Sequence, residues 1–506
     1  MTDAGPLTLG TAGHVDHGKT ALVRALTGVD TDRLPDERAR GLTIVLGYAP
    51  LELPSGRRVS VVDVPGHERF VRTMVAGASG IDAFLMVIAA DDGVMPQTRE
   101  HAAVLRALGV EDGVVAVTKA DAADPARAVA QARELLDARM PVVACSARTG
   151  SGIEELREAL GRLAAGLRSR AASAGPARLH VDRVFTIAGR GTVATGTLWS
   201  GQLAEGEELE LLPAGLRVRT RGLQVHDAQV PRAAAGQRVA VNLAGVARRA
   251  VARGDALASP GTVRATRILD CALELRDARH GERVQVHHGT RDAPGRLALL
   301  DAGAGLWQLR LEAPLLACDG DRLVVRRLAP PDTRGGGVVL DARAGRHGAR
   351  PEILARLRAL ARGEAAPPLA HEAQAPGRGG PRSAPAADPA ALVALEERLR
   401  AAGPALLSEA QMAGEQDALR ALRAAGRAVR VSGRLYAHAD VAADVGRRIV
   451  ALLDARGPAS LAEVRDALGL SRKSAQAFLE QLDAERVTRR LADDRRALRR
   501  TAKVGA

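Results

Sequence analysis

The stretch GTAGHVDHGKT, residues 10–20, constrains this chain more than any other feature. Its second part, GHVDHGKT, matches the phosphate-loop pattern G-x-x-x-x-G-K-[ST] and lies between an apolar strand-like run and a helix-like run, as the pattern requires. Glycines let backbone N–H groups close around phosphate oxygens, Lys19 balances phosphate charge, and Thr20 offers a hydroxyl to Mg²⁺. We therefore predict a nucleotide site formed by Gly13, His14, Val15, Asp16, His17, Gly18, Lys19 and Thr20.

A second motif, DVPGHERF, begins at Asp63 and follows the apolar run VSVV. An Asp at the end of such a strand can hold Mg²⁺ through water, and the N–H group of Gly66 can turn onto the γ-phosphate. His67 then lies within reach of an attacking water. We predict His67 as the catalytic residue of nucleotide hydrolysis.

Two further motifs predict which base is bound. In TKAD, residues 118–121, Asp121 can accept hydrogen bonds from the N1 and N2 donors of guanine while the stem of Lys119 packs on the base. In CSA, residues 145–147, the backbone around Ser146 and Ala147 can donate to guanine O6. Only four of the 72 basic residues are lysines, so two lysines inside nucleotide motifs are unlikely by chance. These motifs favour GTP over ATP, with GTP/GDP and Mg²⁺ as cofactors.

Length and pattern indicate a multidomain protein, since 506 residues with 46% apolar content exceed one hydrophobic core. Apolar runs alternate with helix-like stretches from residue 7 to about 166, which predicts an α/β domain with a parallel sheet. Short β-rich segments follow, which suggest two β-barrels, and two units of about 60 residues end the chain. We place the domains at 1–170, 171–260, 261–343, 388–445 and 446–506, with 344–387 as a linker or a remnant of another module.

The composition indicates where the protein is located and what kind of partner it binds. The N-terminus has no basic start followed by an apolar run, and no long uncharged apolar stretch occurs, so we expect a cytoplasmic monomer without membrane contact. Three scattered cysteines argue against disulfides and zinc. We interpret His287 and His288, at a predicted strand end, as residues of a loop or residues that face a nucleic-acid partner. The net charge of +13 favours a polyanionic partner, but 68 of the 72 basic residues are Arg in an Ala- and Gly-rich chain, so charge alone counts little.

Together the motifs resemble the translational GTPases of the EF-Tu class, over residues 7 to about 341. ADDGVMPQTREH and RARGLTI also resemble that class. The resemblance implies that Thr43 meets Mg²⁺ and the γ-phosphate, and that Val15 and Leu42 form an apolar gate that keeps His67 from its water until the ribosome repositions it. One residue departs from the pattern, because Thr118 stands where most members carry Asn.

The continuation TGVDTDRLPDERARGLTI resembles one branch of that class, the selenocysteine-specific elongation factors of the SelB type. The first predicted barrel opens with ARLHVDRVFTIAGRGTVATGT, so Asp182 and Arg183 stand where an EF-Tu carries two acidic residues at its amino-acid pocket, and Arg238 is similar to another basic pocket residue. A selenol is ionised at neutral pH, whereas the hydroxyl of the seryl precursor is neutral. A cation about 4 Å away attracts an anion by roughly 4 kcal/mol at an effective dielectric near 20. The alternative is that these arginines are ordinary exposed residues.

The end of the chain has the pattern of a winged helix. A capping box starts at Ser460, SRKSAQAFLEQLDAE supplies a helix, and RVTRRL with RRALRRT supplies a hairpin. Basic residues dominate from 486 to 503, so we predict an RNA-binding surface that includes Arg472, Lys473, Arg489 and Arg490. The family binds an mRNA hairpin (SECIS) there. Only two such modules fit here, although bacterial relatives typically have four. A solvated basic face is the alternative.

The leading interpretation is a GTPase that delivers selenocysteinyl-tRNA to the ribosome at UGA codons marked by an mRNA hairpin. Two alternatives remain open at this point: an EF-Tu-like GTPase for another tRNA, and a DNA-binding regulator coupled to a GTPase. The two barrels argue against the regulator, since it has no evident need for a tRNA-binding platform.

Overall fold

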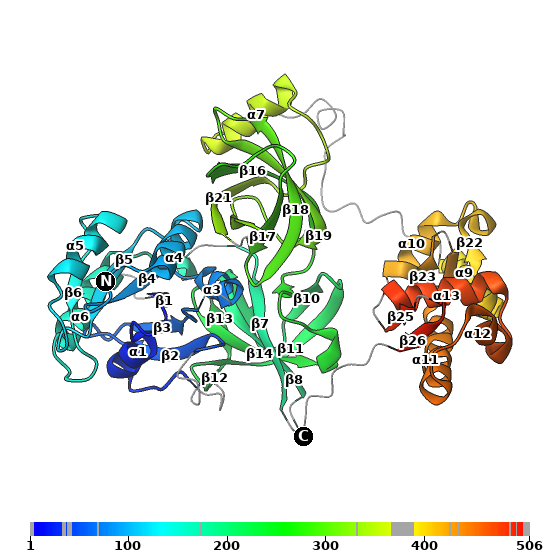
Figure 1. The fold of residues 1–506 in the computed structure, drawn as a ribbon, viewed down its shortest axis with the longest axis horizontal. Helices are drawn as coiled ribbons and strands as arrows, with labels where there is room; N and C mark the ends of the chain where they lie inside the picture. Colours follow the sequence, from blue (N-terminus) through cyan, green and yellow to red (C-terminus); the bar gives the residue numbers. More distant parts are fainter. Residues whose placement is uncertain are drawn as a thin grey trace. The chain divides into compact units, whose positions relative to one another are not determined.

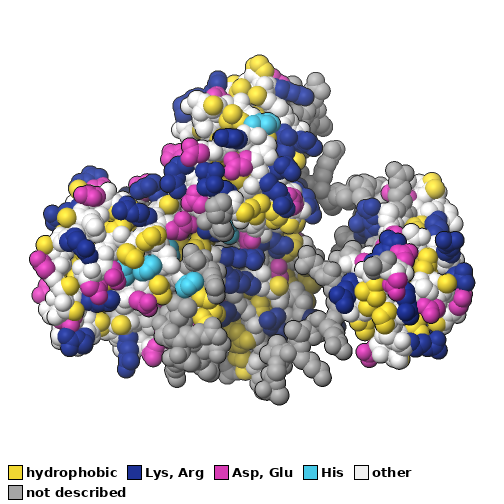
Figure 2. All heavy atoms as spheres, viewed as in Figure 1, with side chains coloured by type: hydrophobic (Ala, Val, Ile, Leu, Met, Phe, Trp, Pro, Cys, Tyr) yellow, Lys and Arg dark blue, Asp and Glu magenta, His cyan; other side chains and the backbone are white. Residues whose placement is uncertain are grey.

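The computed structural model describes residues 5–32, 37, 43–67, 70–172, 175–187, 189, 191–329, 332–365, 389–424, 427–433, 435–484, 487–491 and 493–498. By its internal contacts the chain divides into Met1–Ala375 and Pro376–Ala506. Within the described residues, no helix combines the length and the apolar composition needed to cross a membrane. Figure 2 shows Lys and Arg side chains interspersed with Asp and Glu over the visible face, not gathered in one patch.

The first domain is a six-stranded sheet in the order β2-β3-β1-β4-β5-β6 (Figure 1), parallel except where β2 pairs with β3. Successive residues of its central strand serve two cores: Met86 and Ile88 pack in one, and Leu85 and Val87 in the other. Buried faces on both sides confirm the predicted α/β class. The strands are β1 (Leu7–Gly13), β2 (Gly47–Glu52), β3 (Arg58–Asp63), β4 (Ala83–Ala89), β5 (Gly113–Thr118) and β6 (Val142–Ala144), and the helices are α1 (Lys19–Thr27), α3 (Val71–Ala78), α4 (Pro96–Ala107), α5 (Ala126–Leu135) and α6 (Ile153–Gly166).

Two β-barrels follow, as the sequence predicts. In barrel II the strands run β10-β15-β7-β8-β14-β11, with β12 beside β11, and pairing of β10 with β11 closes the ring. Barrel III is closed in the order β16-β19-β18-β17-β20-β21, while β9 and β13 form a separate two-stranded sheet. The strands are β7 (Arg178–Ile187), β8 (Gly191–Ser200), β9 (Gln202–Ala204), β10 (Glu208–Leu212), β11 (Leu216–Val225), β12 (Ala228–Val230), β13 (Arg232–Ala234), β14 (Arg238–Ala244), β15 (Ala256–Ala258), β16 (Thr266–Leu275), β17 (Arg283–His288), β18 (Arg291–Asp301), β19 (Leu306–Leu315), β20 (Arg322–Arg327) and β21 (Asp332–Asp341).

Barrel III is fixed to the first domain through helix α4. The Glu100 carboxylate accepts hydrogen bonds from Arg326 Nη2 at 3.0 Å and Thr333 Oγ1 at 2.7 Å. Gly336 on β21 lies so close to the helix that a Cβ there would be 2.8 Å from the Ala107 Cβ. The helix therefore packs directly on the barrel.

Helix α7 (Pro351–Ala361) lies within residues 344–387, which the sequence suggested as a linker or remnant module, and residues 366–387 lie outside the described residues. Its Ile353 and Leu357 pack with Leu300, Leu306 and Leu340 of barrel III in one apolar cluster. Arg358 also pairs with Asp301. This helix therefore packs on barrel III.

The C-terminal part contains two winged-helix modules, which one hydrophobic cluster joins and of which the first has a further cluster of its own. Helix α11 runs through the boundary predicted at 445/446, and its Ile449 and Leu453 pack with Val431 of the first module and Phe478 of the second. The two modules are therefore one packed body. The elements are α9 (Pro389–Ala402), η4 (Gly403–Ala405), β22 (Leu407–Ser408), η5 (Glu409–Met412), α10 (Gln416–Ala424), β23 (Ala428–Ser432), β24 (Leu435–His438), α11 (Ala439–Arg456), α12 (Leu461–Leu468), α13 (Arg472–Ala484), β25 (Thr488–Arg490) and β26 (Arg496–Leu498).

Candidate functional site

The phosphate loop joins the end of β1 to the start of α1. Asp16 and Gly18 have positive φ angles of 62° and 82°, so the loop turns back on itself before the helix begins. Lys19 is 6% exposed, and its Nζ donates to the carbonyl oxygens of Gly13 at 3.2 Å and His14 at 2.6 Å. Burial lowers the pKa of Lys19 to about 8. The lysine thus sits inside the loop curve, where a phosphate chain would lie.

Side chains from helix α4 hold the outer side of this loop. His101, which is buried, accepts from the N–H group of Gly13 at 3.0 Å, and Gln97 accepts from that of Val15 at 3.1 Å. The sequence interpretation assigned no role to either residue. Their spacing of four along a helix was the available signal, because it places both on one face.

Thr118, the residue that departs from the EF-Tu pattern, also contacts the loop. Its buried hydroxyl at the end of β5 donates to the carbonyl oxygen of His17 at 2.7 Å. The hydroxyl therefore joins the strand that precedes the base motif to the phosphate loop.

A Thr118→Val substitution keeps the shape of this side chain and removes the bond. Leaving a buried carbonyl without its donor costs about 1 to 3 kcal/mol. We expect guanine nucleotide affinity to fall roughly tenfold, which fluorescent-nucleotide titration would measure. Thr118→Ser, which keeps the hydroxyl, is the control, and equal affinities for the two variants would contradict this role.

The metal corner lies beside the loop and centres on Asp63, whose carboxylate is buried. Thr11, Thr20 and Thr31 donate to it at 2.9, 2.8 and 2.7 Å. The Thr20 and Thr43 hydroxyl oxygens lie 2.9 Å apart. Neighbouring ligands of octahedral Mg²⁺, with Mg–O distances near 2.05 Å, are about 2.9 Å apart.

These residues fit Mg²⁺, which prefers few protein ligands together with substrate phosphates. No group of three or more His, Cys, Asp or Glu side chains arranged to hold a metal ion occurs in the described part of the chain. Thr20 and Thr43 would hold the ion with nucleotide phosphates, and Asp63 accepts a hydrogen bond from Thr20. A cavity of about 810 Å³ opens here, lined among others by Lys19 and Gly66.

His67 lies just after β3, half-buried, with its ring centroid 6.0 Å from that of Phe70. The preceding Gly66 is packed tightly, because a Cβ there would lie 2.7 Å from the Val15 nitrogen. Val15 lines the same cavity. Leu42, the other predicted gate residue, lies outside the described residues.

The base motifs lie at the ends of β5 and β6. Lys119 has a φ of 57° and donates from Nζ to Asp91 at 3.0 Å. Asp121 accepts from Arg148 Nε at 2.9 Å, and hydrogen bonds from Ser146 and Arg148 lower its pKa. Ala147 lines the nucleotide cavity. Arg148 directly follows the CSA motif and was not singled out in the sequence.

A second cluster forms where the first domain meets barrel II. It brings together the three residues predicted for the cargo pocket, Asp182, Arg183 and Arg238. Arg238 Nη2 donates to Asp182 at 2.9 Å and to Thr195 at 3.0 Å. The side chains of Arg238 and Asp182 are only 15% and 6% exposed, so this pair is not an ordinary surface contact.

Tyr48, from strand β2, completes this cluster, and the sequence interpretation missed it. Its hydroxyl donates to Asp182 at 3.0 Å, and its ring lies 3.2 Å from the Arg238 guanidinium carbon and 5.7 Å from that of Arg183. Arg183 donates to the carbonyl oxygen of Leu46. Two cations therefore flank one aromatic ring, and one of them is balanced by a carboxylate.

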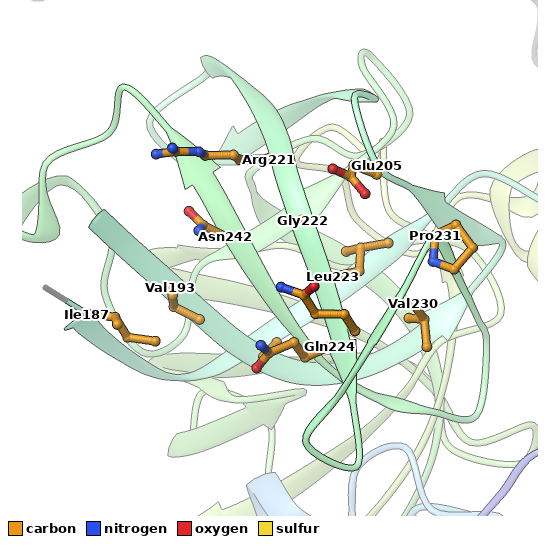
Figure 3. A pocket seen from close by; sticks show the side chains of 12 residues that line it. Ile187, Val193, Glu205, Arg221, Gly222, Leu223, Gln224, Val230, Pro231 and Asn242 are labelled. Atoms are coloured by element: carbon orange, nitrogen blue, oxygen red, sulfur yellow. The ribbon is translucent and has the colours of Figure 1, made fainter. Parts of the chain in front are cut away.

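A cavity of about 400 Å³ lies on the same barrel (Figure 3). The cavity and the cluster share two strands. Val193 of the cavity and Thr195 of the cluster both lie on β8, and Asn242 of the cavity and Arg238 of the cluster both lie on β14. Ile187, Leu223 and Val230 give it apolar walls, while Arg221, Gln224 and Asn242 supply polar groups. A cavity that combines apolar walls with several polar groups suits a ligand that both packs and forms hydrogen bonds.

The two histidines expected to face a loop or tRNA are buried instead. His287 is 4% exposed and His288 is 1% exposed, and His288 Nε2 lies 2.9 Å from Asp321, which also pairs with Arg178 of barrel II. Both histidines therefore pack within the barrels, and the prediction that they face a loop or tRNA is wrong.

In the C-terminal part, the predicted RNA-binding residues lie at two places. Arg472 and Lys473 are exposed at the start of α13, and Arg489 and Arg490 are exposed on β25. Arg490 pairs with Asp494. Arg496 belongs to the basic residues between 486 and 503, but it is only 7% exposed and contacts Asp483. It therefore stabilises the fold and is not part of an exposed basic surface. Residues 486, 499, 500 and 503 lie outside the described residues.

Comparison with known proteins matches the first domain, both barrels and the last C-terminal module to family models. Family models match as follows: elongation factor Tu GTP binding domain at residues 6–165, elongation factor Tu domain 2 at 191–258, selenocysteine-specific elongation factor β-barrel domain at 265–346, and elongation factor SelB winged helix at 451–497. The residues that these models match therefore coincide with barrel II, barrel III and the last C-terminal module as the structure has them.

Relatives agree. The selenocysteine-specific elongation factor of Desulfomicrobium baculatum is 43% identical over 355 residues, which are 66% of this chain and 56% of that protein. The selenocysteine-specific elongation factor of Escherichia coli is 40% identical over 368 residues, which are 71% of this chain and 59% of that protein. This chain thus spans less than three fifths of their length. Elongation factor Tu 2 of Streptomyces avermitilis is 37% identical over 307 residues, 55% and 78%.

Solved structures give the same picture. A bacterial selenocysteine-specific elongation factor, EF-Sec, has a TM-score of 0.66 at 26% identity over 98% of this chain and 100% of its own. SelB of Methanococcus maripaludis, in complex with the GTP analogue GppNHp, has a TM-score of 0.59 at 25% identity over 67% and 79%.

Proposed function

Because this chain belongs to the SelB family of selenocysteine-specific elongation factors, within the EF-Tu class of translational GTPases, we propose that it carries selenocysteinyl-tRNA to the ribosome. It binds GTP in the first domain, acts in the cytoplasm at UGA codons marked by an mRNA hairpin, and hydrolyses GTP when the ribosome stimulates it. The observation that carries the proposal is the cluster of Tyr48, Asp182, Arg183 and Arg238 at the junction with barrel II.

The nucleotide site has the parts that phosphoryl transfer needs. Lys19 would hold the phosphate chain, and Thr20 and Thr43 would hold Mg²⁺, which would supply positive charge beside the phosphates. His67 orients the attacking water. Asp121 reads guanine, which requires it to exchange its contact with Arg148 for the base.

The cargo is distinguished by charge. Arg238 is committed to Asp182, whereas Arg183 has no carboxylate partner among the described residues. The cluster therefore carries one net positive charge, and Arg183 supplies it. Even 2 to 3 kcal/mol of attraction after desolvation corresponds to roughly a hundredfold preference for an ionised selenol over a hydroxyl.

The end of the tRNA fits beside this cluster. The amino acid is esterified to the terminal nucleotide, so a reader of the amino acid needs a base site next to it. The cavity in Figure 3 lies on the same two strands, and Gln224 and Asn242 offer hydrogen-bonding groups to a base edge. At the other end of the chain, Arg472, Lys473 and Arg489 bind mRNA phosphates.

Binding of three nucleic acids tests the proposal: selenocysteinyl-tRNA, its seryl precursor and duplex DNA, each measured at one fixed salt concentration. We expect roughly a hundredfold preference for the selenocysteinyl form, largely lost in Arg183→Met and partly retained in Arg183→Lys, which keeps the charge. Arg232→Met, an exposed barrel II arginine outside the cluster, is the matched control.

Equal binding of both tRNAs would reject the selenium assignment and favour an EF-Tu-like carrier of another tRNA. Preference for DNA would favour the regulator. Nucleotide binding, measured separately, would stand in either case.

A further inference from the structure

The segment Asp30-Thr31-Asp32, which set the sequence apart after the phosphate loop, has no role in the proposed function so far. The structure places its side chains at the metal corner. Thr31 Oγ1 donates to Asp63 Oδ2 at 2.7 Å, and Asp32 Oδ1 accepts from Thr43 Oγ1 at 2.8 Å. Both contacts lead to residues that surround the Mg²⁺ position.

The hydroxyl protons at this corner can be followed one by one. Thr20 has a single hydroxyl proton and gives it to Asp63 Oδ2 at 2.8 Å, and Thr43 gives its own to Asp32. The two hydroxyl oxygens are 2.9 Å apart, so either can also donate to the other. When both protons point to the carboxylates of Asp32 and Asp63, the lone pairs of both oxygens become available to a cation.

We propose that Asp32 is a positioning residue for Mg²⁺. By accepting the hydrogen bond from Thr43, Asp32 directs the lone pairs of the Thr43 hydroxyl toward the ion, as Asp63 does for Thr20. Partners that orient metal ligands in this way are worth about 10- to 100-fold in metal affinity. The inference rests on the proposed nucleotide function and adds a residue to it.

Thr31 supports the other half of the corner. It is 3% exposed and packs on Gly47 of β2, where a Cβ would lie 2.5 Å from the Thr31 Cβ. It donates to the same Asp63 oxygen that accepts from Thr20, so it fixes the direction of that carboxylate. Thr31 and Asp32 therefore act on different hydroxyl ligands. Thr31 acts on Thr20 through Asp63, and Asp32 contacts Thr43 directly.

The test measures dissociation of a fluorescent GDP from the full chain across a Mg²⁺ titration. In Asp32→Ala we expect the Mg²⁺ concentration for half-maximal slowing of dissociation to rise about tenfold or more. Asp32→Asn should show a smaller rise, because its amide oxygen still accepts the Thr43 proton. Asp30→Asn removes the same charge two residues away and measures the effect of charge alone.

A double-variant cycle with Thr43→Ala separates positioning from general electrostatics. If Asp32 acts through Thr43, its substitution adds little once Thr43 is gone. An Asp32→Ala effect no larger than that of Asp30→Asn, or full additivity with Thr43→Ala, would overturn the inference. Failure of the unsubstituted protein to bind guanine nucleotide would instead reject the proposed function, so the two failures are distinguishable.

Discussion

Replacing Arg238 by methionine is expected to destabilise barrel II by about 3 to 5 kcal/mol. The Asp182 side chain is 6% exposed, and the guanidinium is its only cationic partner among the described residues. Removing one member of a buried ion pair leaves an uncompensated charge, whereas removing both is often neutral. Tyr48 and Thr195 still donate to the carboxylate, but neither brings charge.

Tryptophan fluorescence can follow this effect in one barrel. Trp199 lies on β8 of barrel II and Trp307 on β19 of barrel III, and these are the two tryptophans of the chain. In a Trp307→Phe background, thermal unfolding of Arg238→Met should shift down by on the order of 10 °C or more. Asp182→Asn combined with Arg238→Met should recover most of the loss. An unshifted single variant would mean that the pair is more hydrated than its burial indicates.

The same cluster shows what sequence could and could not predict. Asp182, Arg183 and Arg238 were found because they stand at defined positions in a family pattern. Tyr48 was missed because it lies 134 residues before Asp182 and meets it only when the first domain packs on barrel II. Its local sequence, GYAPLE, reads as an ordinary strand.

Local motifs predict position best where one backbone segment carries the residues. The phosphate loop, Asp63 and the base motifs all lie at ends of predicted strands, because parallel strands direct their carboxyl ends to one edge. Gln97 and His101 belong to the same site, yet their role appears only once α4 is placed against the loop.

Amphipathic patterns predicted elements but not their partners. Ile353 and Leu357 stand four residues apart, as on one face of a helix, and the structure buries that face on barrel III. Likewise, the boundary proposed at 445/446 falls inside α11, whose apolar face serves both C-terminal modules. A periodic pattern says that a face is buried, and only the tertiary structure says against what.

Replacing Lys19 by methionine is expected to lower affinity for GTP by roughly a thousandfold. A cation about 4 Å from a phosphate charge contributes roughly 4 kcal/mol at an effective dielectric near 20, and the loop holds Lys19 at the centre of its curve. The fold should not suffer, since burial already disfavours the charged form, as the lowered pKa of Lys19 shows. Thermal unfolding should therefore be unchanged or slightly higher.

The scarcity of lysine supplies a matched control for this experiment. Lys473→Met makes the same chemical change on the exposed start of α13, so it should leave GTP affinity intact and weaken binding of an RNA hairpin. Lys19→Met should do the reverse. Titration with a fluorescent GTP analogue and with a hairpin RNA gives both readings, and a Lys19→Met protein that binds GTP within tenfold of the parent would refute the assignment of the loop. Reciprocal losses would show that each lysine acts in its own domain, one on nucleotide phosphates and the other on RNA phosphates.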